Sequence, residues 1–236
     1  MADESNVVKL VEMINTMLAV MPLESGLFIG AWILGLAIAI ILHEVSHGWV
    51  AFKLGDPTAY YAGRLTLNPI KHVDLWGTII VPMLLIVSQV GVVFGWAKPV
   101  PVNYYNLKYG KYGPLLVSLA GPGINLMLLI VFAVAARLAP VGTQLPALFL
   151  VVALINGFLM LFNLIPIPPL DGSKVLYVFL EDRPEVVQFL ERYGFVILLG
   201  VIFLLPGFIS RWAFMPSVQL VSLFSGFSIG DVISVM

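Results

Sequence analysis

Residues 26–47 have the sequence GLFIGAWILGLAIAIILHEVSH, in which an apolar run leads directly into three ionisable side chains. Residues 26–42 of this stretch contain no charged side chain. A helix needs about 20 apolar residues to cross a hydrocarbon core about 30 Å thick. Ionisable groups inside such a helix are costly and are usually kept for function. The stretch therefore predicts a membrane span with a functional group of residues near its end.

The rest of the composition agrees with a membrane protein. Of the 236 residues, 60% are hydrophobic and 11% are charged, whereas a soluble domain is about half apolar and a quarter charged. Further apolar stretches occupy 113–138, 146–164, 194–209 and 212–229. A net charge of −1 gives no reason to expect a nucleic-acid partner. We therefore predict an all-α polytopic protein, folded as a helical bundle in the lipid bilayer; the sequence sets no oligomeric state.

The distribution of basic residues predicts a topology. Nine of the twelve Lys and Arg residues lie in two regions, 53–111 and 174–192. The positive-inside rule places both regions in the cytoplasm only if the apolar segment 77–95 does not cross the membrane. This segment contains Pro82, Ser88 and Gln89 and has basic residues on both sides, which favours a re-entrant or interfacial element over a full span.

The residues HEVSH at 43–47 are typical of a zinc site. On a helix, His43 and His47 lie four positions apart on one face and can bind the same ion. Glu44 lies beside them and can take a proton from metal-bound water. The chain has no cysteine, so any metal must be held by His, Asp or Glu. A chance match to this short motif is the alternative.

A catalytic zinc has three protein ligands and one open position, so a third ligand is expected. Asp171 follows the 146–164 span, in NLIPIPPLDG at 163–172. If 77–95 returns to its own side, Asp171 reaches the same membrane face as the two histidines. The alternative for Asp171 is to cap the next helix. His72, in a polar loop, is the competing ligand.

Three segments together resemble the site-2 protease family of intramembrane zinc metalloproteases. They are HEVSH, AGPGIN at 120–125 and NLIPIPPLDG, and the resemblance spans about residues 26–180. It implies one zinc ion held by His43, His47 and Asp171, with Glu44 as the general base. It also implies a transmembrane protein or peptide substrate, a multi-pass position in the cell membrane, and an active site toward the cytoplasm.

The resemblance makes further implications about substrate binding. It implies that Asn125 and Asn163 hold an unwound substrate or stabilise the developing oxyanion, with hydrogen bonding between helices as the alternative. It suggests that 60–68 and 97–103 are strands whose edges pair with an extended substrate. The chain is similar to short members of the family that lack a PDZ or CBS domain.

We accordingly expect one membrane-embedded metalloprotease domain over 1–236, with short β or re-entrant elements on the cytoplasmic side. An interfacial helix is expected within 1–25, a catalytic core of three helices in 26–180, and C-terminal helices in 181–236. The interfacial helix is predicted from the amphipathic stretch 7–21, for which a short span is the alternative.

Two other functions are compatible with histidines in a membrane. A metal-ion transporter would need ionisable residues along several spans, and 114–136 and 195–209 contain none. A membrane binding protein that has lost catalysis is the second alternative, and the intact Glu44 argues against it.

Overall fold

The computed structural model describes residues 26–89, 94–140 and 142–235, and these residues form helices and loops without a strand. Four helices are long and apolar enough to cross a membrane: α2 (Gly26–Lys53), α5 (Tyr112–Leu138), α6 (Leu145–Asn163) and α8 (Pro184–Leu204). The predicted all-α polytopic membrane protein is confirmed. The predicted interfacial helix at 7–21 lies outside the described residues.

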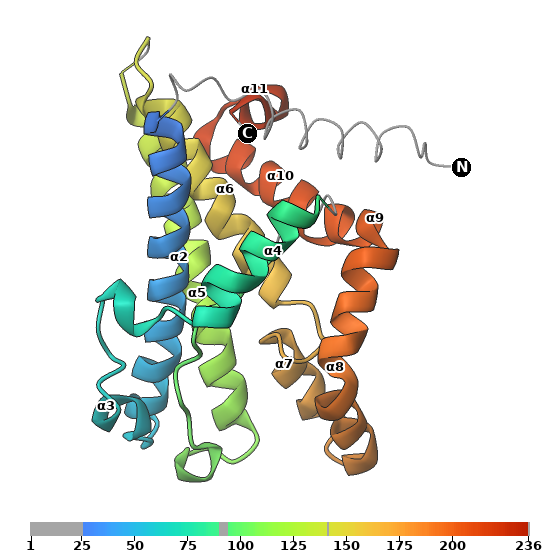
Figure 1. Ribbon diagram of the computed structural model, residues 1–236. Helices are drawn as coiled ribbons and strands as arrows, with labels where there is room; N and C mark the ends of the chain where they lie inside the picture. The colour runs from blue at the N-terminus through green and yellow to red at the C-terminus, as the bar shows by residue number, and fades with distance from the viewer. Residues whose placement is uncertain (1–25, 90–93, 141, 236) are drawn as a thin grey trace.

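Helices α2, α5 and α6 pack against one another as the predicted three-helix core. In Figure 1, α2 runs downward, α5 upward and α6 downward, so α2 ends and α5 begins at the lower end of the bundle. Small residues allow the close approach of such helices in lipid. A Cβ added at Gly35 would lie 3.1 Å from Cγ2 of Val152, which shows how near α2 comes to α6.

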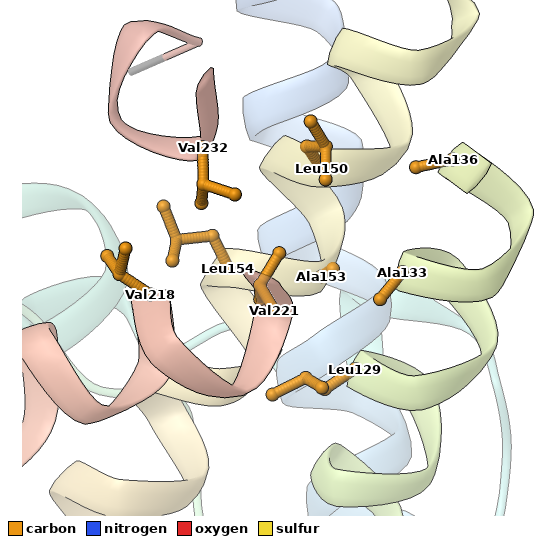
Figure 2. Close-up of a cluster of buried hydrophobic side chains, with 9 residues drawn as sticks. All are labelled: Leu129, Ala133, Ala136, Leu150, Ala153, Leu154, Val218, Val221 and Val232. Atoms are coloured by element: carbon orange, nitrogen blue, oxygen red, sulfur yellow. The ribbon is translucent and has the colours of Figure 1, made fainter. Parts of the chain in front are cut away.

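The upper end of the bundle is held by a buried apolar cluster contributed by four helices (Figure 2). Two of them are short: α10 (Met215–Ser225) and α11 (Ile229–Ser234). The cluster consists of Leu129, Ala133 and Ala136 of α5, Leu150, Ala153 and Leu154 of α6, Val218 and Val221 of α10, and Val232 of α11. The apolar stretch 212–229 is thus not one crossing helix, because Gly226 ends α10 with a φ of 76°.

Helix α8 stands beside this bundle and begins ten residues before the apolar stretch that starts at 194. Pro184 occupies a first-turn position, where its missing N–H costs nothing, and a charged turn follows it. A Cβ added at Gly194 would lie 2.6 Å from the Pro168 carbonyl oxygen, so α8 packs on the proline-rich loop. Leu198 joins Ile165 and Leu170 in a small apolar cluster there.

The described parts of the segment 77–95 begin and end close together. The segment contains most of a π-helix, Leu75–Ile80, and the helix α4 (Val81–Ser88) that follows it. The two helices together are too short to span a membrane. The Trp96 N–H donates to the Gly77 carbonyl over 3.0 Å, so the two ends of the segment meet. This arrangement supports the prediction that 77–95 does not cross. Trp96 also packs against Phe195 of α8, with ring centroids 6.2 Å apart.

The two predicted strands are wrong. Residues 60–68 contain the end of α3 (Thr58–Tyr61) and a turn at Gly63, and a 3₁₀-helix follows at Pro69–Lys71. Residues 97–103 have no regular structure and lead into a second 3₁₀-helix, Tyr104–Asn106. Pro99 and Pro101 have no N–H group, which removes ladder hydrogen bonds from this segment. The N–H groups of Lys98, Val100 and Asn103 donate instead to the His72 carbonyl, Glu44 and Asp56.

Candidate metal centre

His43 and His47 lie one turn apart on α2, and the two residues are 7% and 9% exposed. Asp171 lies immediately before α7 (Gly172–Phe179), at the lower end of the proline-rich loop. Its Oδ2 lies 3.1 Å from Nε2 of His43 and 3.3 Å from Nε2 of His47. Asp171 makes no capping hydrogen bond to α7, so the capping alternative is wrong. The three residues predicted as ligands are brought together.

His72 is not at this centre. It is 3% exposed, and its Nε2 lies 2.8 Å from the Thr66 carbonyl oxygen, to which it donates. Among the described residues, the cluster of side chains that could share one metal ion consists of His43, His47 and Asp171. The competing third ligand is therefore excluded by its position.

Hydrogen bonds behind the two histidines fix where their protons lie. Nδ1 of His47 is 2.7 Å from the Val117 carbonyl oxygen, which can only accept, so this nitrogen carries the proton. Nδ1 of His43 is 2.6 Å from Oδ1 of Asn125, an amide oxygen that also only accepts. In a neutral ring with a protonated Nδ1, Nε2 has the free lone pair. Both lone pairs therefore face the Asp171 carboxylate.

This convergence of acceptors fits a zinc ion. Oδ2 of Asp171 is buried and has no hydrogen-bond partner. Ligand distances of about 2.0–2.1 Å around tetrahedral zinc place two ligand atoms about 3.3 Å apart, close to the separations found here. A Cβ added at Gly121 of α5 would lie 2.5 Å from Nε2 of each histidine. The glycine leaves open the space that an ion between these atoms requires.

Glu44 lies beside the cluster and is held by a distant part of the chain. Its Oε2 accepts a 2.8 Å hydrogen bond from the backbone N–H of Val100. The neighbours of Val100 are Pro99 and Pro101, so Val100 supplies the only N–H of these three residues. A Cβ added at Gly48 would lie 2.8 Å from Cγ1 of Val100, so this glycine lets the segment approach α2.

The same segment is anchored by a buried carboxylate, that of Asp56. Asp56 is 0% exposed, and its Oδ2 accepts from the Asn103 N–H over 2.7 Å. Its Oδ1 accepts from Thr58 and from the Asn106 amide. Burial raises the pKa of Asp56, but these hydrogen bonds outweigh burial and leave its pKa lowered. An Asp before a proline gives no sequence signal for contacts this far along the chain.

The asparagines have different surroundings. Oδ1 of Asn125 faces His43, while its Nδ2 donates to Oδ1 of Asn156 over 2.9 Å, so both ends of the amide are engaged. This is the interhelical hydrogen bonding that was the alternative to substrate contact. Nδ2 of Asn163 donates to Leu159 within α6. Asn156 was missed, although it is the only hydrogen-bonding side chain in 145–162.

A polar cluster beside Asp171 joins three elements of the lower end. The Lys174 ammonium lies 5.4 Å from the Tyr104 ring and 4.6 Å from the Tyr177 ring, and 3.4 Å from Oε1 of Glu191. Burial raises the pKa of Tyr177 to about 12. Burial, with Asp171 and Glu191 nearby, also raises the pKa of Tyr104. The cluster ties the segment after 103 and α7 to α8.

A buried His–His–Asp cluster with an adjacent glutamate, set among apolar helices, defines a membrane-embedded zinc metallopeptidase. Residues 138–205 match the profile of Peptidase family M50. The chain is 40% identical over 185 residues to YwhC of Bacillus subtilis (strain 168), whose name describes a zinc metalloprotease; the match covers 74% of this chain and 80% of YwhC.

A second relative is Rip2 of Mycobacterium tuberculosis (strain ATCC 25618 / H37Rv), which is also named as a zinc metalloprotease. It is 33% identical over 196 residues, or 80% of this chain and 72% of Rip2. No solved structure matches the chain at a significant level. The chain belongs to peptidase family M50, the site-2 protease family, and is a zinc metalloprotease.

Proposed function

We propose that this protein is a zinc-dependent intramembrane endopeptidase that hydrolyses peptide bonds in transmembrane or membrane-proximal segments of its substrates. The observation that carries this proposal is the convergence of His43, His47 and Asp171 within a bundle of membrane-spanning helices. His43 and His47 lie on α2 itself, so the proposed metal site is part of an apolar span rather than of a separate soluble unit.

In this proposal His43, His47 and Asp171 hold the zinc, and Glu44 is the general base. Zinc, when bound, lowers the pKa of a coordinated water to about 7 and polarises the substrate carbonyl. Glu44 accepts the proton of the attacking water and passes it to the leaving amine. The Val100 N–H holds one carboxylate oxygen of Glu44 in place, which leaves the other oxygen available for the proton. Asp171 neutralises part of the ion's charge in a site with little water.

Asn163 remains a proposed contact for the substrate or its developing oxyanion. It is the last residue of α6 and begins the loop that leads to Asp171, and its side chain is only partly buried. For Asn125 we propose support of His43 instead, because its amide is already engaged on both sides. The two asparagines therefore have separate roles in this account.

The site is proposed to face the cytoplasm from a multi-pass position in the cell membrane. Nine of the twelve basic residues lie in 53–111, which leads from α2 to α5, and in 174–192, which follows Asp171 along the chain. The return of 77–95 keeps both regions on one side. We further propose a single domain in which 26–180 is the catalytic core, since this range contains every site residue.

Comparative membrane proteomics of cells with the wild-type protein or Glu44→Gln tests the proposed function. Membrane-protein fragments should be present with the wild type and vanish with the variant, while their uncleaved precursors accumulate. Equal amounts of the Glu44→Gln and wild-type proteins in the membrane control for folding. Fragments that persist unchanged in the variant would show that Glu44 is not the base of a proteolytic reaction.

A further inference from the structure

The structure assigns a positioning role to Asn156: we propose that it sets the orientation of the Asn125 amide and thereby selects the metal-binding form of His43. This inference rests on the proposed zinc site. The groups form one continuous line of hydrogen bonds from α6 through α5 to α2. We call Val152, Asn156 and Asn125 the amide chain.

The amide chain begins at a group whose direction is fixed. Nδ2 of Asn156 donates to the Val152 carbonyl oxygen over 2.9 Å, within α6. A backbone carbonyl can only accept, so the nitrogen of the Asn156 amide must face it. The oxygen of the same amide therefore points the other way, toward α5. Asn156 is 0% exposed, so water does not compete for either end.

This orientation passes to Asn125, which is also 0% exposed. Oδ1 of Asn156 requires a donor and receives Nδ2 of Asn125 at 2.9 Å. Oδ1 of Asn125 is then left facing Nδ1 of His43 at 2.6 Å, which obliges that nitrogen to carry the proton. The Nε2 lone pair of His43 is thus directed toward Asp171.

The opposite orientation of Asn125 would be incompatible with a metal. Its Nδ2 would then donate to Nδ1 of His43, the proton would move to Nε2, and this nitrogen could not bind zinc. The flipped amide would also place Oδ1 of Asn125 against Oδ1 of Asn156, two acceptors facing each other in a buried site. Asn156 therefore disfavours the flipped Asn125 amide, in which Nε2 of His43 carries the proton and cannot bind zinc. His47 needs no amide to fix its proton, because its Nδ1 donates directly to the Val117 carbonyl oxygen.

Zinc affinity of the purified full-length chain tests this role, measured by competition with a chelator. Asn156→Leu removes the acceptor and should weaken zinc binding about tenfold, within the range found for outer partners of metal ligands. Asn156→Asp keeps an oxygen facing Asn125, and as a buried neutral acid it can donate its O–H to the Val152 carbonyl, so it should bind zinc nearly as the wild type does. Ser217→Ala, which removes another fully buried side-chain hydrogen bond, controls for general loss of buried polar contacts.

A double variant separates positioning from packing. In Asn125→Leu no amide faces Nδ1 of His43, so Asn156 has no orientation to select. Adding Asn156→Leu to this background should then change zinc affinity by no more than about twofold. An equal loss in both backgrounds, or no loss in Asn156→Leu alone, would overturn the proposal. Because the readout is zinc binding, failure of the proposed proteolysis would be seen separately, as normal affinities without substrate cleavage.

Discussion

The backbone N–H of Val100 donates a 2.8 Å hydrogen bond to Oε2 of Glu44, although 56 positions separate the two residues in the sequence. One partner belongs to a membrane-spanning helix and the other to a loop segment fixed at several points. Lys98 bonds to the His72 backbone, and Asn103 bonds to Asp56. The glutamate of the zinc motif is therefore held by an element outside the three-helix core.

Replacing Val100 with proline should lower proteolytic turnover by about 10–100-fold, since a hydrogen bond to a charged group contributes about 1.5–3 kcal/mol. The change removes the N–H and replaces the valine side chain with the proline ring, while the neighbouring prolines already restrict the backbone. Val100→Ala retains the N–H and should stay within about threefold of the wild type. Equal turnover in the two variants would show that the hydrogen bond does not serve catalysis. Zinc affinity, measured alongside, should be unchanged in both.

Gly121→Ala should weaken zinc binding strongly, because its Cβ would lie 2.5 Å from Nε2 of both histidines and would displace them. Gly123→Ala is the matched control on the same helix, since a Cβ there has no neighbour within 4 Å. Both substitutions favour the helix equally. Zinc affinity in the two variants checks the close approach of α5 to the metal centre. The same affinity in both would contradict it.

Asp56→Asn should destabilise the folded protein by about 1–3 kcal/mol at pH 7, because an amide cannot accept from all the donors that surround the carboxylate. The pKa of Asp56 is lowered on folding, so its carboxylate stabilises the fold above the usual value of 3.8. This stabilisation is lost as the pH falls below 3.8 toward the lowered pKa. Thermal unfolding in detergent at pH 7 and at about pH 3 should show the variant and wild type converging in acid. A constant difference would contradict this role.

The sequence predicts well those features that depend on neighbouring residues. The apolar runs predict the spans because crossing a membrane requires length and hydrophobicity together. HEVSH predicts two ligands because four residues make about one helical turn. The sequence also predicts that Asp171 lies at the same membrane face as the two histidines, because the charge distribution favours a return of 77–95 to its own side.

Contacts between distant segments could not be predicted in this way. The strands expected at 60–68 and 97–103 are absent. In 97–103, prolines remove donors, and the N–H groups of Lys98, Val100 and Asn103 bond to the His72 backbone, Glu44 and Asp56. Residues 60–68 instead complete a short helix and turn at Gly63. For Asn125 the sequence left open both substrate contact and hydrogen bonding between helices, because only its position on the helix could be inferred and not the direction of its amide. The proposed role of Asn163 stays a prediction.

The account as a whole depends on zinc being held by His43, His47 and Asp171, and the most direct measurement is zinc retention by Asp171→Ala under increasing chelator. The wild type should hold one zinc per chain. Losing a ligand should lower affinity by more than about 100-fold, because even outer partners contribute about 10–100-fold. Asp182→Ala removes an exposed carboxylate 11 positions further along the chain and should match the wild type. If Asp171→Ala retained zinc as firmly as Asp182→Ala, the ligand set would be wrong.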